Sequence, residues 1–250
     1  MFSLAYRLVC LISFMVFYSF AYAQEISTSE NSGVCEGSPE LNVTSNNINL
    51  DQKTMTFFLE GDIFVTGEGF CFSTDSEVSI ITNEQNPSKI DEFEIMGEFS
   101  LTLARENQTH IKANKGKFVE EENKFVFEDE VVITDFYQGA NETLKADRGQ
   151  YLLSTDNFSL EDNIILEIET ITLTASKAEF ISAENLVKFT NEVEMINNDP
   201  TQKSEIRSEV AEYYFDDRVM ILSDNVSGTY GPSTFSGRDR LVYNWNSEDN

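Results

Sequence analysis

Histidine, tryptophan, proline and cysteine are scarce in this chain of 250 residues. It has one histidine, one tryptophan, four prolines and three cysteines. The lone His110 has no Cys or His partner at the spacing of zinc ligands, so we expect no metal site. The small number of prolines would permit helices, but the chain has no long apolar stripe with a 3.6-residue period. We therefore expect little helix.

The chain also lacks the short motifs of common enzymes. It has no Gly-x-Ser-x-Gly phrase, no phosphate-binding loop and no dinucleotide fingerprint. Paired carboxylates such as Glu128 and Asp129 could do acid–base chemistry. They recur along the chain, however, whereas an active site is unique. We expect a protein that is not an enzyme, with no catalytic residue and no cofactor.

Basic residues are few relative to acidic ones. The chain has 17 Lys and Arg against 44 Asp and Glu, for a formal net charge of −27. Such a surface repels nucleic acids and anionic bilayers at long range, so we expect no nucleic-acid partner. The charge is spread along the chain, as on the solvated faces of strands.

The N-terminal segment 1–23 has the layout of a cleavable secretory signal. One positive charge, Arg7, precedes the apolar run 8–22, and Ala21-Tyr22-Ala23 provides a small-x-small cleavage site. A spanning helix needs about 20 apolar residues, more than this run has. We expect cleavage after residue 23 and export to the periplasm, with an uncleaved membrane anchor as the alternative.

Two cysteines remain after the predicted cleavage, Cys35 and Cys71. A disulfide between them suits an oxidising compartment and would fix the N-terminal segment to the first repeat. Two free thiols are the alternative. A redox pair is disfavoured because no Cys-x-x-Cys motif is present.

One short pattern returns along most of the chain. Small residues two positions after an apolar residue stand at Ala113, Ala146, Ala175, Ser208 and Gly237, in steps of 33, 29, 33 and 29 residues. Eighteen residues after each of the first four comes Val131, Ile164, Val193 or Val226, which closes an acidic or Asn-rich phrase. A fixed period of this size indicates stacked supersecondary units.

Between these marks apolar and polar side chains alternate, as in strands with one buried face. We expect two strands per repeat, a tight turn at each acidic phrase, and a bend or bulge where the spacing of Ala113 and Gly116 breaks the alternation. The predicted fold is all-β: an elongated open β-jellyroll or solenoid-like stack of repeated antiparallel strand pairs. Its expected parts are a flexible leader at 24–40, the repeat domain at 41–243 and a polar tail at 244–250.

The phrases Leu59-Glu-Gly-Asp-Ile63-Phe-Val65, Leu144-Lys-Ala146-Asp-Arg-Gly-Gln-Tyr151 and Leu173-Thr-Ala175-Ser-Lys-Ala-Glu-Phe180 resemble the OstA-like family, which includes the LptA and LptC proteins of lipopolysaccharide transport. The resemblance covers nearly the whole chain after the predicted signal. It implies an open β-jellyroll whose apolar groove holds the acyl chains of lipopolysaccharide. It also implies head-to-tail self-association and docking to OstA-like domains of the inner-membrane and outer-membrane transport proteins.

The resemblance makes the regularly spaced apolar residues candidates for this lipid-binding groove. They are Ile63, Val65, Phe99, Phe127, Val131, Leu160, Ile164, Phe189, Val193, Leu222 and Val226. Plain core packing explains each of them equally well. The aromatic residues Phe118, Tyr151, Phe180 and Tyr213 are expected to take part in stacked aromatic packing at the corner of the repeat.

Three functions remain open at this stage. The first is a non-catalytic periplasmic lipid carrier that shields acyl chains and bridges the inner and outer membranes. The second is a secreted or surface structural β-solenoid without a ligand. The third is the inner-membrane-anchored transport partner, if the N-terminal segment is not cleaved.

Overall fold

The computed structural model describes residues 42–67, 69–82, 90–104, 109–134, 142–201 and 203–244. The predicted signal 1–23, the leader 24–40 and Cys35 lie outside the described residues.

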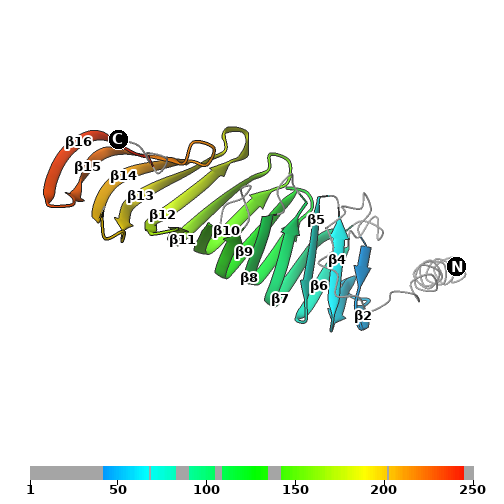
Figure 1. Ribbon diagram of the computed structural model, residues 1–250. Helices are drawn as coiled ribbons and strands as arrows, with labels where there is room; N and C mark the ends of the chain where they lie inside the picture. The colour runs from blue at the N-terminus through cyan, green and yellow to red at the C-terminus, as the bar shows by residue number, and fades with distance from the viewer. Residues whose placement is uncertain are drawn as a thin grey trace, which may run out of the picture. The chain divides into compact units, whose positions relative to one another are not determined.

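Sixteen strands form a single antiparallel sheet (Figure 1). Figure 1 shows β7 to β16 side by side in chain order; β5 and β6 both lie next to β7, and β4 lies beyond β5. The strands are β1 (Asn42–Thr44), β2 (Asn47–Asp51), β3 (Thr56–Glu60), β4 (Ile63–Gly67), β5 (Phe70–Thr74), β6 (Glu77–Thr82), β7 (Ile90–Leu103), β8 (Thr109–Val119), β9 (Lys124–Thr134), β10 (Thr143–Leu152), β11 (Asn157–Ile168), β12 (Ile171–Ile181), β13 (Leu186–Asn197), β14 (Ser204–Tyr214), β15 (Val219–Tyr230) and β16 (Ser233–Asn244).

This architecture confirms the predicted all-β class and the stack of antiparallel strands. The described part of the chain contains one short 3-10 turn, Ser182–Glu184. No helix in that part is long and apolar enough to cross a membrane. The last strand ends at Asn244, the first residue of the predicted tail.

Each long strand bends near its middle, so the sheet forms two layers joined along a line of corners. In β9, for example, residues 124–128 pair with 148–152 of β10, whereas 131–134 pair with 143–146, and the register shifts between the two blocks. Layer 1 consists of β2, β3, β6 and the halves of later strands that pair in line with them. Layer 2 consists of β1, β4, β5 and the other halves.

The acidic phrases form these corners and do not connect one strand to the next. In β9 both Asp129 and Glu130 have positive φ, 62° and 56°, and the same pair of left-handed residues recurs in β11, β13 and β15. Residues 128–130 are exposed, while Phe127 and Val131 on either side both point inward. The tight backbone expected at each acidic phrase is therefore present as a bulge that bends one continuous strand, and not as a turn that reverses the chain.

The chain reverses instead at hairpins far from the corners. In layer 1 the long strands are connected by the short turns 120–123, 153–156, 182–185 and 215–218. Each ends on a residue with positive φ: Asn123, Asp156, Asn185 and Arg218. Asn and Asp adopt this conformation more readily than most residues, which accounts for three of the four turns; the fourth ends on Arg218.

Buried small residues lie at the corners of β8, β10, β12 and β14, and the bend predicted at Ala113 and Gly116 is present. In β8 both Ala113 and Gly116 are buried, although their spacing of three breaks the alternation, and the register shifts at this point. A Cβ on Gly116 would come within 2.7 Å of the ring of Phe99. The two layers converge here, so there is little room for larger side chains.

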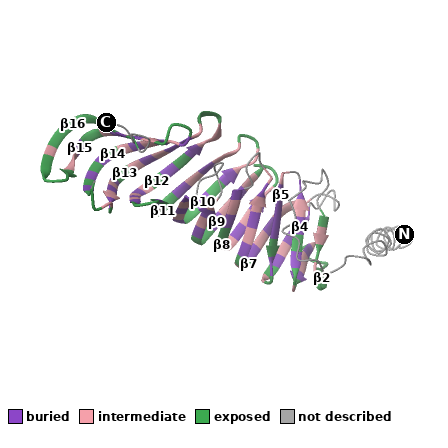
Figure 2. Cartoon of the chain, viewed as in Figure 1, coloured by how far each residue is buried: buried purple, intermediate pink, exposed green. Residues whose placement is uncertain are grey.

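The buried side chains of both layers belong to one hydrophobic core. Figure 2 shows the buried positions repeating along β7 to β14, with more exposed strands toward β16. The core is therefore continuous along the stack, with both layers contributing to it in every repeat.

Candidate lipid-binding interior

The eleven predicted groove residues all lie in the interior. Their side chains are at most 3% exposed, and all belong to the single core. In β9, β11, β13 and β15 they flank the corner bulge in pairs, for example Phe127 with Val131 and Phe189 with Val193. The structure thus places the predicted residues in the space between the layers, most of them next to the corners.

Side chains of the two layers fill this space by contacting each other directly. Phe72 of layer 2 lies 5.1 Å from Phe93 of layer 1, measured between ring centroids. Phe70 of layer 2 meets Phe125 of layer 1 edge-to-face at 4.9 Å. A chain-like apolar ligand would therefore have to separate the layers before it could reach the deep residues.

Opposite the corners, the free margins of the two layers meet along a line that we call the seam. Hairpins along each margin are hydrogen-bonded within their own layer. Leu153 N donates to Asn123 O at 3.0 Å in layer 1, and Asn198 N donates to Thr170 O at 2.9 Å in layer 2. Among the described residues, no backbone hydrogen bond crosses the seam. Within the described residues, the layers are thus joined by main chain only at the corners.

The seam has two sections of different chemistry. Toward the N-terminal end, Phe70 of layer 2 packs against Phe118 and Phe125 of layer 1, and we call this the aromatic section. Farther along, polar side chains bridge the layers.

This polar section contains two buried hydrogen bonds and one ion pair. Tyr213 OH of layer 1 donates to Glu142 Oε1 at the margin of layer 2, at 2.8 Å. Asn197 Nδ2 of layer 2 donates to Tyr243 OH of layer 1, at 2.6 Å.

The ion pair of the polar section is more exposed. Arg218, in the hairpin between β14 and β15, lies 3.6 Å from Glu169, in the hairpin between β11 and β12. Both side chains are about half exposed or more, so this pair is worth little by itself.

Burial changes the acid–base properties of the Glu142–Tyr213 pair. Desolvation raises the pKa of Glu142, and this outweighs the opposing effects of the hydrogen bond from Tyr213 and the charge of Arg218. Desolvation, followed by the charge of Glu142, raises the pKa of the Tyr213 hydroxyl. Glu142 is only 7% exposed, and no described protein group donates to its Oε2.

The four aromatic residues predicted to pack at the corner lie instead beside the layer 1 hairpins, at the seam. Phe118, for example, pairs with Phe125 across the hairpin between β8 and β9. The predicted aromatic packing is present: Phe158 stacks on Phe180 at 4.7 Å, and Tyr213 meets Phe215 at 4.7 Å. The position was wrong because the chain turns at these hairpins and not at the acidic phrases.

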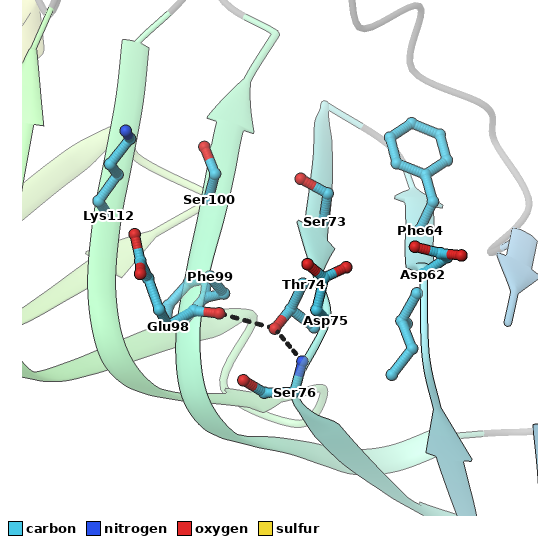
Figure 3. Close-up of a pocket in the computed structure, with 11 residues that line it drawn as sticks. Asp62, Phe64, Ser73, Thr74, Asp75, Ser76, Glu98, Phe99, Ser100 and Lys112 are labelled. Carbon is cyan, nitrogen blue, oxygen red and sulfur yellow. Dashed lines mark hydrogen bonds between the residues drawn. The ribbon is translucent and has the colours of Figure 1, made fainter. Parts of the chain in front are cut away.

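The outer surface near the first corners carries a polar hollow of about 640 Å³ (Figure 3). The carboxylates of Asp62, Asp75 and Glu98 line it together with Lys112. Figure 3 shows Thr74 at its base, where the hydroxyl donates to the Glu98 carbonyl at 2.7 Å and accepts from Ser76 N at 2.9 Å. This hollow is unsuited to an acyl chain. Within the described residues, no group of three or more His, Cys, Asp or Glu side chains could hold a metal ion.

The basic residues that recur with the repeat point outward. Lys145 Nζ lies 2.7 Å from Glu167 Oε2, and Arg207 pairs with Glu194 at 2.7 Å. These are cross-strand ion pairs on the solvated faces of the strands, where the sequence predicted the charged residues to lie.

Cys71 lies in β5, buried at 8% exposure, and is disulfide-bonded. Its predicted partner, Cys35, lies outside the described residues, so the pairing stays a prediction.

Sequence reasoning missed the polar residues of the seam. Glu142 and Asn197 stand at the ends of layer 2 strands, where nothing in the repeat marks them. One signal was available. At the aromatic position of the repeat, two copies have tyrosine, Tyr151 and Tyr213, where the others have phenylalanine. A buried tyrosine usually needs a hydrogen-bond partner.

No family model and no curated protein matches the sequence. Among solved structures, the chain is similar to LptH from Pseudomonas aeruginosa, described as the LptA-homologous periplasmic component of the lipopolysaccharide transport device. The two chains are 13% identical, with a TM-score of 0.45 over 54% of this chain and 98% of LptH. A likeness of this degree does not establish membership of a family.

Proposed function

We propose that this protein is a non-catalytic lipid carrier that holds acyl chains between the two layers of its sheet. The observation that carries the proposal is the seam beside a continuous apolar interior. In the part of the chain that the structure describes, main chain joins the layers only at the corners, so the layers can part at the seam without breaking any backbone pairing seen there. Aliphatic and aromatic side chains such as Phe127, Phe189 and Leu222 suit an acyl chain.

The energetic exchange is favourable for a long acyl chain. Parting the layers loses apolar contacts, and a bound chain restores them. Burial of a methylene group contributes about 0.8 kcal/mol, so several acyl chains could offset the cost of parting.

Lipopolysaccharide is the lipid that the sequence resemblance implies. In the proposed complex its acyl chains lie inside and its polar sugars remain in solvent beyond the seam. The protein's net charge of −27 opposes adsorption to an anionic membrane surface. Such a carrier would release its cargo without remaining on the bilayer, as expected of a periplasmic bridge between membranes.

The two ends of the sheet suit end-to-end association with another copy or with a related OstA-like domain. At the N-terminal end, Ile48 and Leu50 of β2 are 42% and 44% exposed. They pair with Leu59 and Phe57, so they lie on the inner face of layer 1. At the C-terminal end, β16 is a largely exposed edge strand with Val242 at 53% exposure. Exposed edges of this kind invite strand addition.

A structural β-solenoid without a ligand is the second candidate. The dense packing favours it, because the eleven candidate residues are at most 3% exposed. The two functions differ in whether the layers part.

Native mass spectrometry of the purified protein mixed with lipopolysaccharide tests the proposal. A carrier should give a saturable complex of one protein with one lipid, and the same lipid stripped of its acyl chains should give none. A complex with the deacylated lipid, or none with either, would contradict the carrier and favour the structural protein.

A further inference from the structure

We propose that the polar section of the seam is a latch, centred on Glu142 and Tyr213, that controls where and how readily the two layers part. The latch comprises the Tyr213–Glu142 and Asn197–Tyr243 hydrogen bonds and the Arg218–Glu169 ion pair. It deepens the proposed function, on which its role in lipid uptake rests.

The latch residues connect elements that no backbone pairing joins. Glu142 precedes β10, whereas Tyr213 lies in β14, four strands further along the stack. Asn197 of β13 bonds Tyr243 of β16 in the same way, three strands away. Every latch contact therefore crosses the seam, and none would survive a separation of the layers.

The closed latch is finely balanced. The bond from Tyr213 to a carboxylate stabilises closure, since hydrogen bonds to charged groups are the stronger kind. Against this, closure buries Glu142 with its Oε2 lacking a protein donor among the described residues. Opening would hydrate that oxygen. A buried polar group with incomplete hydrogen bonding is costly, so closed and open states lie closer in free energy here than in an apolar seam.

Among the three phenylalanines that form the aromatic section, no buried polar group offsets the contacts that hold the layers together. Phe70, Phe118 and Phe125 form a tight cluster with centroid distances of 4.7 to 5.9 Å. Parting these rings exposes only apolar surface to water, which is unfavourable throughout. We therefore place the opening of the seam at the polar section, with the aromatic section remaining closed.

Amide hydrogen exchange of the intact protein tests the latch without any lipid. Tyr213→Phe removes the hydroxyl and leaves Glu142 buried without it. We expect exchange to accelerate at least roughly tenfold in 143–146 and 214–219, where the two margins meet, and to stay unchanged at the aromatic section.

Tyr151→Phe is a matched control. Tyr151 occupies the same place in its repeat, but its hydroxyl bonds Asp156 in the next hairpin of the same layer. This variant should leave exchange at the polar section at the wild-type rate. The double variant Glu142→Leu/Tyr213→Phe removes both polar partners and should restore slow exchange.

The proposal of a latch is wrong if Tyr213→Phe and Tyr151→Phe give the same rate of amide exchange at the polar section. It is also wrong if Tyr213→Phe accelerates exchange equally in all parts of the protein. Should Tyr213→Phe fail to fold, Arg218→Ala removes the exposed ion pair with Glu169 and the positive charge near Glu142, and leaves the Tyr213–Glu142 hydrogen bond in place. It should give a smaller acceleration, roughly twofold, confined to the hairpins 168–171 and 214–219, and no acceleration there would overturn the latch.

A measurement of lipid uptake tests the latch separately from the proposed function. Uptake of fluorescently labelled lipopolysaccharide should be faster in Tyr213→Phe than in Tyr151→Phe. Lipid uptake at equal rates in both variants would contradict the latch and leave the carrier intact. An exchange response with no lipid uptake by any variant would contradict the carrier and leave the latch as a property of the fold.

Discussion

Glycine on both sides of Phe127 allows this large ring to lie deep in the corner. Phe127 pairs with Gly116 of β8 on one side and with Gly149 of β10 on the other. Farther along the stack the equivalent positions are Ala178 and Ala211, which flank Phe189. The corner tolerates a methyl group there, so the need for glycine is local.

Gly116→Ala should destabilise the protein by about 1–3 kcal/mol, as overpacking does in a close-packed core. The added Cβ would approach two atoms of the Phe99 ring within 2.7 Å. Urea unfolding measures the change. Gln150→Ala, on the exposed face of β10, is the control and should stay within about 0.5 kcal/mol of wild type. A Gly116→Ala protein as stable as wild type would show that the corner has spare room.

Glu142 should make the stability of the protein depend on pH in a definite direction. Its pKa is raised in the folded state, chiefly by burial, so folding favours its protonated form. The stabilisation is complete below the usual glutamate pKa and is lost as the pH rises through the higher folded value. The charges of Arg218 and Glu169, together with the Tyr213 hydroxyl, act on Glu142 in the same site.

Comparison with Glu142→Gln isolates this effect, because both proteins share every other titrating group. The free energy of unfolding of wild type relative to the variant should fall from pH 4.5 towards neutral pH. Urea unfolding at a series of pH values measures it. A difference that is constant, or that rises with pH, would mean that Glu142 is not desolvated.

At the scale of elements, the bent strand defines the fold. Two consecutive residues with positive φ bend β9, β11, β13 and β15, and the register shifts at each bend. Left-handed backbone costs an ordinary L-residue roughly 1–2 kcal/mol, less for Asn and Asp. The recurrence of Asp and Asn at these positions reduces that cost in every repeat.

Asn191→Val tests the bend of β13, where Asn191 has φ of 66°. A β-branched residue should destabilise the protein by about 1–2 kcal/mol, whereas Asn191→Gly should remain near wild type. Thermal unfolding compares the two. Thr190→Val, next to the bend in extended backbone, serves as the control, and an equal loss in Thr190→Val and Asn191→Val would assign the effect to the side chain and not to φ.

The sequence was sufficient to predict strands, the bulge at Ala113 and Gly116, and the burial of all eleven candidate residues. These follow from alternation and spacing, which are local. It was insufficient to distinguish a chain-reversing turn from a bend at Asp129, because both use left-handed Asn or Asp. It could not place Glu142 against Tyr213 either, since that contact depends on how one layer crosses the other.

At the scale of the whole repeat domain, the two layers are offset along the stack. This offset determines which side chains are exposed at the two ends of the domain. Contacts at the seam join strands two to four places apart, as Phe70 of β5 does with Phe118 of β8. The first strands of layer 1 and the last strands of layer 2 therefore extend past the opposite layer. Ile48 and Leu50 at one end and Tyr230 at the other are exposed on inner faces for this reason.

If the protein associates end to end, Leu50→Glu should weaken the association at least tenfold, because it places a charge in the interface. Phe64→Glu is the matched control: Phe64 is 45% exposed against 44% for Leu50, but it lies on the outer face of β4. Light scattering over a range of protein concentrations measures both. Equal behaviour of the two variants would exclude the N-terminal edge as an interface.

The most direct test of the carrier is photo-crosslinking in cells, with a photoreactive residue at Phe189 in the interior or at Lys145 on the outer face. The two positions are comparable because both lie in the middle repeats, and Lys145 pairs outward with Glu167. We expect lipopolysaccharide to crosslink at Phe189 and not at Lys145. Crosslinking at neither position, or equally at both, would contradict the proposal that acyl chains lie between the layers.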